Sequence, residues 1–579
     1  MALSQFLLFP NSGHSKILQP VQIKPPSLLK TNVSYVRHPI QCMAIYRRSG
    51  NFEPSIWHYD YIQSLTTEFA EEFYTKQRDE LKEEVRTMLC KMANPLPQLE
   101  LIDVIQRLGV DYHFSNEIKN ILDHVYNNKD TFNRERNLHA AALEFRLLRA
   151  HGYHVFADVF DGFRDGKQNF KESLSADIMG MLSLYEASFY SMDNEIILDQ
   201  ARNFSSKYLK EFLHKIEDTE FSLLVRHTLE IPLQWRMPRL EASWFIDVYG
   251  RRKSISHSLL KLAKLDFNMV QAIHQEDLKH LSRWWKTVAL EEKLSFARDR
   301  LVENFLWTVG LAFQSQFGHF RRVMTKVNAL ITLIDDIYDV YGTLEELELF
   351  TNVVDRWDVN AMDTLPEYMK ICFIQLYNFL NEVACEEKGH QILPYLVKAW
   401  ADLCKAYLIE AKWYFSGYTP SLEEYIENAW ISISAPVILI HVYFLVENPI
   451  RNDGLNYLEE HCNIIRFASM ILRLADDLGT SKREMETGDV PKSIQCYMHE
   501  TGASEAHARE HIKSMISAAW KKMNEEANHS CFSKSFIEIA TNLARMSICM
   551  YQHGDGHTDQ DPETKNRILS LLFQPIPIV

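Results

Sequence analysis

Apolar residues recur at three- and four-residue spacing along nearly the whole chain from residue 60 onward. The pattern is clear in LPQLELIDVIQRLGV (96–110), LHAAALEFRLLRAHGY (138–153) and ESLSADIMGMLSLYEASFY (172–190). Side chains at this spacing fall on one face of an α-helix. Sustained alternation of apolar and polar residues between turn dipeptides, which would indicate strands, is absent from the sequence. We therefore predict an all-α fold.

The chain has 579 residues, more than one hydrophobic core usually holds. A polar, basic stretch, YGRRKSISH (249–257), separates two long helical blocks. Capping boxes mark helix starts in the second block, at Thr343 with Glu346 and at Ser421 with Glu424. We predict two helical domains, residues 47–255 and residues 256–579.

The first 46 residues differ from the rest of the chain. They contain basic but no acidic side chains, and the first acidic residue is Glu53. A compact apolar core followed by a small-residue cleavage site is missing, which disfavours a secretory signal peptide. A basic, acid-free and polar leader is typical of an organelle transit peptide, with a disordered tail as the alternative. We predict that residues 1–46 are a transit peptide.

The net charge and the cysteines of the chain limit the classes of partner and the compartment that we expect. The formal net charge is −15 and no dense basic block occurs, which disfavours nucleic acid or an anionic membrane. The longest apolar run, APVILIHVYFLV (435–446), has 12 residues, fewer than the roughly 18–20 that span a bilayer. We interpret it as a core helix and expect no integral membrane contact.

Nine scattered cysteines without a CxxC pair indicate a reducing compartment.

The segment LITLIDDIYDVYG (330–342) places carboxylates in a hydrophobic helix. Its apolar side chains go all round the helix, so the helix is interior or lines a cavity. Asp335 and Asp339 are four residues apart, on one face and roughly 6 Å from each other. Such a pair is stabilised by a cation, and oxygen-only ligands suit Mg²⁺ or Mn²⁺. A solvated acidic stripe, or caps for neighbouring helices, are the alternatives.

A second acidic segment, SMILRLADDLGTSKRE (469–484), repeats this combination. Asp476, Thr480 and Glu484 follow one another at four-residue spacing, so one stripe presents two carboxylates and a hydroxyl. All three side chains offer hard oxygen ligands. Two such stripes on facing helices would form a cup for several divalent ions.

Basic residues flank both acidic stripes. RDR (298–300) precedes Asp335, Arg473 precedes Asp476, and Lys492 follows Glu484. A cup of metal ions requires an anion with several oxygens, and diphosphate fits, because arginine makes bidentate phosphate contacts. For any one of these basic residues a surface ion pair is the alternative.

These residues match the motifs of a known family. DDIYD (335–339) resembles the DDxxD motif of class I terpene synthases, and DDLGTSKRE (476–484) resembles their second metal motif, (N/D)DxxS/TxxxE. RDR (298–300) resembles their RxR element. Arg47 and Arg48, followed by eight residues and Trp57, resemble the RRx8W element of plant monoterpene synthases. The likeness covers essentially residues 47–579.

The resemblance implies a C-terminal class I terpenoid synthase bundle around an apolar cavity, and an N-terminal domain without chemistry of its own. It implies three Mg²⁺ ions, or Mn²⁺, of which two bind Asp335 and Asp339. The third would bind Asp476, Thr480 and Glu484. Asp336 is usually outside the metal shell in this family. The resemblance further implies that the segment with Arg47 and Arg48 caps the cavity mouth. The diphosphate side chains would be Arg298 and Arg473, with Lys492 and Arg300 as further candidates.

A carbocation formed in this cavity would need apolar and aromatic walls. Trp307 and Tyr551 are candidates, with plain core aromatics as the alternative. Pro436 removes the hydrogen bond to the carbonyl of Ser432, which could then face the cation, although a simple helix kink is also possible. Asn328 lies two helical turns before Asp335 and could position water or steer the cation, or be a satisfied buried amide. His557 is a further candidate for the cavity wall.

We therefore expect a plastid monoterpene synthase that ionises geranyl diphosphate. Its product would be acyclic or cyclic, of the myrcene, ocimene, linalool, terpineol or limonene type. Isoprene synthases carry Phe at the positions of Asn328 and Leu472, which argues against a five-carbon substrate. The alternatives are a cytosolic sesquiterpene synthase using farnesyl diphosphate, a chain-elongating prenyltransferase, which would normally carry two DDxxD motifs, and a non-catalytic helical scaffold. We expect a small-molecule prenyl diphosphate as partner, no nucleic acid, and a monomer or weak homodimer.

Overall fold

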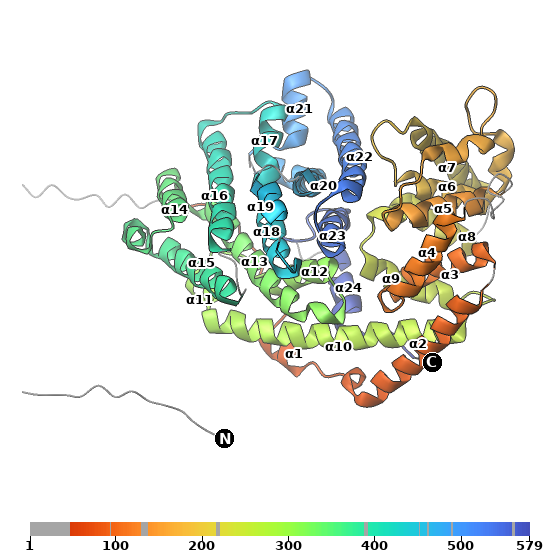
Figure 1. Ribbon diagram of the computed structural model, residues 1–579. Helices are drawn as coiled ribbons and strands as arrows, with labels where there is room; N and C mark the ends of the chain where they lie inside the picture. Colours follow the sequence, from red (N-terminus) through yellow and green to blue (C-terminus); the bar gives the residue numbers. More distant parts are fainter. Residues whose placement is uncertain are drawn as a thin grey trace, which may run out of the picture. The chain divides into compact units, whose positions relative to one another are not determined.

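The computed structural model describes residues 47–92, 94–128, 137–215, 220–386, 392–450, 452–459, 463–487, 490–558 and 562–578, without the side chains of 386, 452, 457, 459 and 482–487. The predicted transit peptide, residues 1–46, lies outside the described residues. Residues 47–579 form one compact unit. Throughout the described ranges the regular structure is helical, with a single isolated β-bridge between Arg164 and Phe170 (Figure 1). The predicted all-α fold is confirmed.

The first half of the chain contributes helices α1 to α9. The sequence patterns at 96–110 and 138–153 correspond to α3 and α5. The pattern at 172–190 is only partly one helix: residues Glu172–Ala176 form a 3-10 turn, and α6 begins after Asp177, whose side chain accepts a hydrogen bond from the Gly180 amide. The helices are α1 (Tyr59–Ser64), α2 (Glu72–Lys91), α3 (Pro95–Arg107), α4 (Ser115–Asn127), α5 (Leu138–Ala150), α6 (Ile178–Ser188), α7 (Ile196–Lys215), α8 (Glu220–Glu230) and α9 (Pro238–Gly250).

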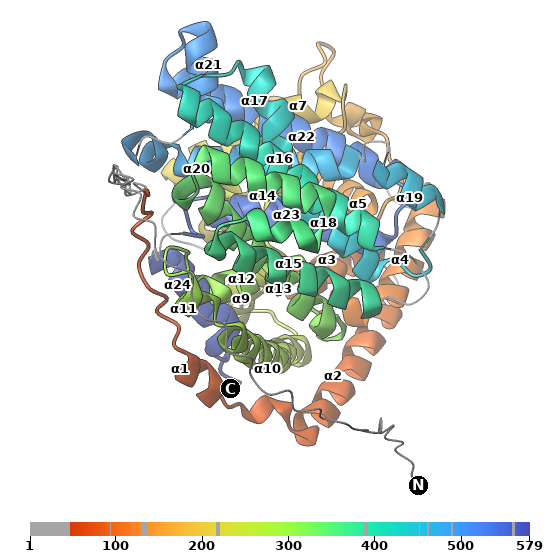
Figure 2. The same ribbon diagram turned by 90° about the vertical axis from the view of Figure 1, so that its left-hand side faces the viewer.

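The second half of the chain contributes α10 to α24, of which many lie side by side in a bundle (Figure 2). These helices are α10 (His257–Val288), α11 (Leu290–Lys293), α12 (Leu301–Leu311), α13 (Gly318–Asp336), α14 (Leu344–Arg356), α15 (Glu367–Glu386), α16 (Leu393–Ser416), α17 (Leu422–Ser432), α18 (Ala435–Val446), α19 (Asn452–Glu459), α20 (Asn463–Thr487), α21 (Ser493–Thr501), α22 (Glu505–His529), α23 (Lys534–Met550) and α24 (Pro562–Ile568). Thr343 and Glu346 form the predicted capping box before α14; before α17, Ser421 accepts from the Glu424 amide.

Helix α10 joins the two halves. It has 32 residues and runs beneath both sets of helices in Figure 1. It packs against α1, α2 and α9 as well as against α12 and α13 of the bundle. The loop between α9 and α10 coincides with the predicted boundary at residue 255, and that boundary stays a prediction.

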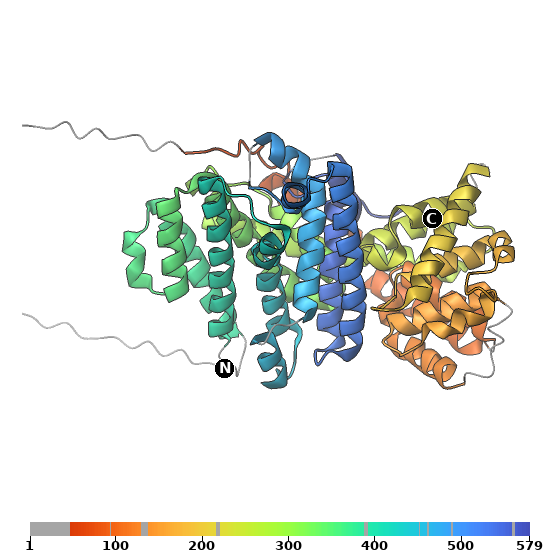
Figure 3. The same ribbon diagram turned by 90° about the horizontal axis from the view of Figure 1, so that it is seen from above.

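Helix α22 adds further contacts between the halves (Figure 3). The ring of Trp520 stacks on that of Trp235, with centroids 5.5 Å apart. Asn524 donates from Nδ2 to the carbonyls of Phe189 and Ser191, both at 2.9 Å. The ring stack is an apolar contact and the two hydrogen bonds are directional. The first nine helices therefore support the bundle along α22 as well as along α10.

Helices α17 and α18 form one apolar stretch with a break. Residues Leu422–Val446 together are long and apolar enough to cross a membrane by length and composition, and 61% of their most apolar window is buried in the protein. Ser434, between the two helices, has a φ of 67°. The helices pack against α16, α20 and α13, so the stretch occupies the interior of the bundle, in line with the predicted core helix over 435–446.

Candidate active site

The first aspartate motif lies where α13 changes its helical pitch. Helix α13 ends at Asp336, and Ile337–Tyr341 form a π-helical turn. The prediction of a continuous α-helix through Asp339 was therefore wrong in this detail. A π turn holds about one residue more per turn, and such turns are frequent at functional sites. Asp335 and Asp339 still share an environment, because the charges of both, after burial, raise the pKa of Tyr407 well above its ordinary value.

The second motif lies on α20. Asp476 and Thr480 are largely buried, at 8% and 5% exposure, and the Thr480 hydroxyl donates to the Asp476 carbonyl at 2.9 Å. That bond uses the only hydroxyl proton of Thr480 and leaves oxygen lone pairs to accept or ligate. The backbone of Glu484 continues α20, and its side chain lies outside the described residues.

One cavity of about 430 Å³ brings the two motifs together. Its wall contains Asp335 and Asp339 from α13 and its π turn, and Asp476 and Thr480 from α20. These segments are about 140 residues apart in the sequence, so their convergence is a tertiary feature. The other predicted residues that line the cavity are Arg298, Trp307, Asn328, Ser432, Leu472, Arg473, Lys492, Tyr551 and His557.

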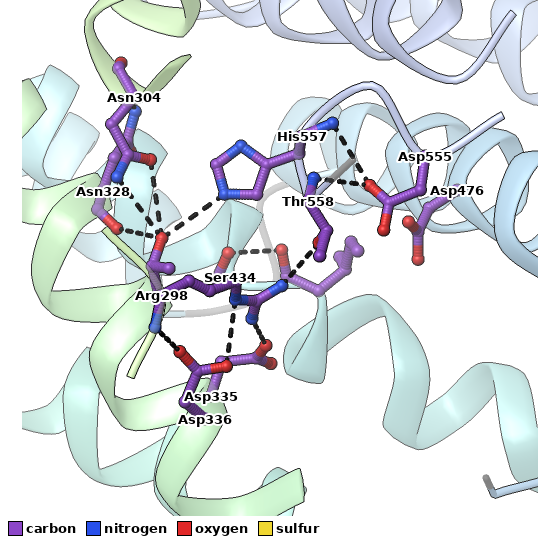
Figure 4. Close-up of polar contacts among 12 residues, drawn as sticks. Arg298, Asn304, Asn328, Asp335, Asp336, Ser434, Asp476, Asp555, His557 and Thr558 are labelled. Atoms are coloured by element: carbon purple, nitrogen blue, oxygen red, sulfur yellow. Dashed lines mark hydrogen bonds and ion pairs between the residues drawn. The ribbon is translucent and has the colours of Figure 1, made fainter. Parts of the chain in front are cut away.

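Arg298 is the basic group of the first motif (Figure 4). Its NH2 contacts Asp335, its Nε lies 2.9 Å from an Asp336 oxygen, and its NH1 donates to the Thr558 hydroxyl at 2.7 Å. Burial alone would lower the pKa of Arg298, but the charges of Asp336 and Asp335 raise it above its ordinary value. Burial also raises the pKa of Asp336 to about 7. Arg298 therefore stays a cation at the cavity wall.

Arg473 is the basic group of the second motif and repeats this geometry. Its Nε donates to Asp477 at 2.8 Å, and its NH2 contacts Asp476. Lys492 is 5% exposed and lines the same cavity. Three cationic side chains thus face four oxygen-bearing ones, which is the charge pattern needed to hold a polyanion together with divalent cations.

Arg300, also predicted to bind substrate, has a different environment. Its guanidinium donates to the backbone carbonyls of Thr558, Glu53 and Asp299, at 2.7–3.1 Å. It is 2% exposed and is not among the described residues that line the cavity. The guanidinium groups of Arg298 and Arg300 both reach Thr558, Arg298 at its hydroxyl and Arg300 at its carbonyl. These contacts give Arg300 a supporting position, and a direct substrate contact is left as a prediction.

Another part of the wall combines aromatic rings with a polar network around His557, and Figure 4 shows the polar contacts. The Trp307 ring lies 6.2 Å from that of Tyr551 and 6.4 Å from that of His557, measured between centroids. Thr332 donates to the Asn328 carbonyl at 2.9 Å and lies 3.4 Å from His557 Nε2. Burial, followed by the charge of Arg298, lowers the pKa of His557 to about 3, so its imidazole is neutral. Among the described atoms, Asn328 Oδ1 and His557 Nδ1 are buried without a hydrogen-bond partner.

The break between α17 and α18 also faces the cavity, through Ser432, Ile433 and Ser434. Pro436 stands in the first turn of α18 and has no amide proton for the Ser432 carbonyl, as predicted. The hydroxyl of Ser432 donates to Glu410 on α16 at 2.5 Å. Both side chains are nearly fully buried, so α16 fixes the position of the break. The position of Pro436 predicted that the Ser432 carbonyl loses its helical hydrogen bond. That this carbonyl faces the carbocation stays a prediction.

The first described residues also belong to the cavity. Arg48–Phe52 contribute to the wall, and Arg48 lies over the Tyr414 ring at 4.1 Å. Arg47 anchors this segment by two 2.8 Å bonds to Glu346 and a 3.0 Å bond to the Tyr341 carbonyl. The role of this segment as a cap over the mouth stays a prediction.

Several cavity residues escaped the sequence analysis. Asp555 accepts from the amides of His557 and Thr558, at 3.1 and 2.9 Å, and so shapes the loop that carries them. These residues belong to no recognisable sequence motif. They are identified only because they lie close to the metal motifs in the folded protein. The residues concerned are Asn304, Thr332, Tyr407, Glu410, Asp555 and Thr558.

The donor set fits magnesium. Within the described side chains, no three His, Cys, Asp or Glu groups are already close enough to hold an ion. Asp335, Asp339, Asp476 and Thr480 nevertheless offer only hard oxygens to one cavity, as Mg²⁺ prefers. Asp335 and Asp476 each already accept a guanidinium, so both positions stabilise positive charge. The arrangement can bind divalent ions and a diphosphate at one end and an apolar chain at the other.

Two family profiles match the chain. Residues 286–522 match the terpene synthase family metal-binding domain, and residues 56–229 match the terpene synthase N-terminal domain. The chain belongs to the terpene synthase family.

Individual relatives agree with this assignment. The chain is 58% identical over 597 residues to a chloroplastic myrcene synthase of Quercus ilex, covering 100% of both proteins. A crystal structure of limonene synthase with 2-fluorolinalyl diphosphate is similar at 46% identity and a TM-score of 0.89, over 92% of this chain and 100% of that one. Isoprene synthase of grey poplar (Populus x canescens), solved with three Mg²⁺ ions and dimethylallyl-S-thiolodiphosphate, is similar at 45% identity and a TM-score of 0.83, over 90% and 99%.

Proposed function

We propose that this chain is a plastid monoterpene synthase that converts geranyl diphosphate into an acyclic or cyclic monoterpene with release of diphosphate. One observation carries the proposal: two acidic stripes and two arginines, from three separate segments, line a single cavity to which aromatic and apolar side chains also contribute. The acidic stripes and arginines suit a diphosphate with its metal ions, and the aromatic and apolar residues suit a hydrocarbon chain. A scaffold protein has no use for this combination.

Asp335 and Asp339 would hold two Mg²⁺ ions, and Asp476, Thr480 and Glu484 a third, with Mn²⁺ as a substitute. The bound ions would neutralise charge on the diphosphate oxygens and make that group a better leaving group. Arg298 and Arg473 present guanidinium groups, which bind phosphate oxygens in a bidentate manner, and Lys492 adds a third positive charge. Three magnesium ions accompany a diphosphate analogue in the similar isoprene synthase structure.

The rest of the cavity protects the reactive cation. The rings of Trp307 and Tyr551 present π faces that attract positive charge. The segment Arg48–Phe52 covers the mouth and keeps bulk water out, which a carbocation requires. Water held by a wall group can still react, and Asn328 Oδ1 is a candidate acceptor for it. The cavity wall therefore sets which atoms the cation meets, and so the product.

The ten-carbon substrate follows from the RRx8W element, the transit-like leader and the relatives. The Quercus ilex relative is named as a chloroplastic myrcene synthase, and the limonene synthase structure contains a linalyl diphosphate analogue. Asn328 and Leu472 both line the cavity where isoprene synthases carry Phe. We further propose a monomer or weak homodimer without nucleic-acid or integral membrane partners.

The experiment uses purified residues 47–579, which form one compact unit, with geranyl or farnesyl diphosphate and gas chromatography of the products. We expect monoterpenes from geranyl diphosphate with Mg²⁺, and none after chelation with EDTA until Mg²⁺ is restored. Faster turnover of farnesyl diphosphate would favour the sesquiterpene alternative. Absence of Mg²⁺-dependent diphosphate release from either substrate would refute the enzyme proposal. Import of the full chain into isolated chloroplasts, with loss of the leader, tests the location.

A further inference from the structure

Asp477 follows the metal ligand Asp476 and has no part in the metal set described above. Its side chain is completely buried, yet it accepts hydrogen bonds from three donors. The Tyr425 hydroxyl lies 3.0 Å from both carboxylate oxygens, Arg473 Nε donates to Oδ1 at 2.8 Å, and the Ser493 amide donates to Oδ2 at 3.1 Å. A buried carboxylate with this many partners is fixed in place, because moving it would leave several polar groups unsatisfied.

The three donors come from three different elements. Tyr425 belongs to α17, Arg473 to α20 itself, and Ser493 is the first residue of α21, directly after Lys492. Arg473 and Lys492 are two of the four Arg and Lys side chains among the described residues of the cavity wall, with Arg298 and Arg48. Asp477 is therefore linked to one of them through its side chain and to the other through the neighbouring backbone.

The same arrangement occurs on the opposite wall. Arg298 Nε lies 2.9 Å from Asp336, which is 1% exposed, while its NH2 contacts the metal ligand Asp335. Arg473 Nε likewise contacts buried Asp477, and its NH2 contacts the metal ligand Asp476. In both motifs one buried aspartate lies beside the inner nitrogen of an arginine, with a hydrogen bond in the second motif and an ion pair without hydrogen-bond geometry in the first. The other aspartate of each motif contacts the outer nitrogen.

We propose that Asp477 is a positioning residue: it holds Arg473 by Nε so that the outer nitrogens of the guanidinium face the diphosphate oxygens. The inference rests on the proposed function, because it concerns the diphosphate end of that site. An arginine held in advance loses less rotamer freedom when the anion binds, so binding is stronger. Released from Asp477, the long side chain would sample several rotamers and would meet the diphosphate less often.

Asp477→Asn is the direct test, since the amide has almost the same shape. An asparagine offers one acceptor oxygen and one NH₂ group. In one orientation the NH₂ group meets Arg473 Nε and in the other the Ser493 amide, and neither of these donors can accept a hydrogen bond. The substitution therefore releases Arg473 or the start of α21 without opening a cavity. Asp477→Glu, which keeps the charge and displaces it by one methylene, is the second variant if Asp477→Asn does not fold.

The matched control is Asp266→Asn. Asp266 on α10 is also a buried aspartate, 1% exposed, which accepts from the Tyr112 hydroxyl at 2.6 Å and contacts His113 Nε2 at 2.8 Å. It is not among the described residues of the cavity wall. Asp266→Asn thus makes the same chemical change at a comparable depth, and separates a general loss of stability from a loss at the site.

The measurement is titration calorimetry of inorganic diphosphate into the full chain with saturating Mg²⁺, together with thermal unfolding of each variant. We expect Asp477→Asn to raise the Kd for diphosphate about 10- to 100-fold, the range for a lost hydrogen bond to a charged group. Asp477→Glu should raise it about tenfold, and Asp266→Asn should leave it within threefold of wild type. In an Arg473→Gln background, Asp477→Asn should add less than threefold, because the residue acts through Arg473.

A Kd within threefold of wild type in folded Asp477→Asn or Asp477→Glu protein overturns the inference. Fully multiplicative effects of Arg473→Gln and Asp477→Asn overturn it as well, since the two residues would then act independently. Absence of diphosphate binding by the wild-type chain is a different result and counts against the proposed function itself.

Discussion

The Nε atom of Arg298 lies 2.9 Å from a carboxylate oxygen of Asp336, at the part of the cavity wall that α13 forms. The same guanidinium contacts Asp335, which is the more exposed of the two, with 27% of its side chain accessible. The two neighbouring aspartates, Asp335 and Asp336, therefore differ in their environment. Asp336 is buried beside the inner nitrogen of the arginine, whereas Asp335 faces the cavity, where the proposed metal ion would take the place of the guanidinium as its partner.

Asp335→Ala should lower turnover of geranyl diphosphate at least about 100-fold, because it removes a metal ligand. The far-UV helical signal should stay, since Asp335 is partly exposed and no helix depends on its side chain. The measurement is product formation by gas chromatography, with circular dichroism of the same sample. Asp402→Ala, an exposed aspartate on α16 paired with Lys398, is the control and should keep full activity. Near-wild-type turnover of Asp335→Ala would disprove the metal assignment.

Arg47→Ala should loosen the segment over the cavity mouth. The variant loses both bonds to Glu346 and the bond to the Tyr341 carbonyl, each of them charge-assisted. We expect cleavage near residues 47–58 by a protease to become about tenfold faster or more, for a loss of about 1.5–3 kcal/mol. Because water then reaches the cation more easily, the alcohol fraction of the products should rise. Arg251→Ala, at an exposed ion pair with Asp247, is the control. Unchanged proteolysis and products would show that Arg47 does not hold the cap.

Glu241→Gln should destabilise the first half of the chain. Glu241 is 4% exposed and lies 2.8 Å from Arg107 NH2, Arg236 NH1 and His227 Nε2. Burial would raise the pKa of Glu241, but the charges of Arg236 and Arg107 lower it well below its ordinary value. Removing the negative charge leaves two arginines unbalanced and should cost about 3–5 kcal/mol of unfolding free energy at neutral pH.

The lowered pKa also fixes the sign of a pH effect. A carboxyl whose pKa is lower in the folded state stabilises the fold above its ordinary value of 4.5, and this stabilisation is lost as pH falls further. Wild-type unfolding free energy should therefore decrease below pH 4.5 more steeply than that of Glu241→Gln. Urea unfolding at several pH values between 3 and 7 measures both slopes. Parallel slopes would exclude Glu241 as a source of the acid sensitivity.

The two acidic motifs could be found in the sequence because their oxygen-bearing side chains recur at four-residue spacing. Asp476 and Thr480 do lie on one α-helix, whereas the α-helix of Asp335 gives way to the π turn before Asp339. That argument needs only local geometry. The roles of Thr558 and Asp555 could not be predicted, because Thr558 reaches Arg298 from 260 residues away. The π turn was also missed, since its spacing differs from an α-helix by less than one residue per turn.

Asn328→Leu should lower the share of alcohols among the products. Asn328 belongs to the cavity wall; its Nδ2 donates to the Asn304 carbonyl at 3.4 Å, and its Oδ1 is buried without a partner among the described atoms. An unsatisfied buried acceptor of this kind is a place where one water molecule can be held close to the cation. Leucine has a similar volume and no acceptor, so the cation should be quenched by proton loss instead.

The measurement is the ratio of alcohols to hydrocarbons from geranyl diphosphate in ¹⁸O-labelled water, which also shows that the oxygen comes from solvent. We expect the ratio to fall about tenfold, which corresponds to about 1.4 kcal/mol between two competing reactions of one cation, while total turnover changes less. Asn381→Leu on α15, whose amide donates to the Tyr377 carbonyl and does not belong to the described cavity wall, should leave the ratio unchanged. An unchanged ratio in Asn328→Leu would place the reacting water elsewhere in the cavity and make Asn328 a structural amide.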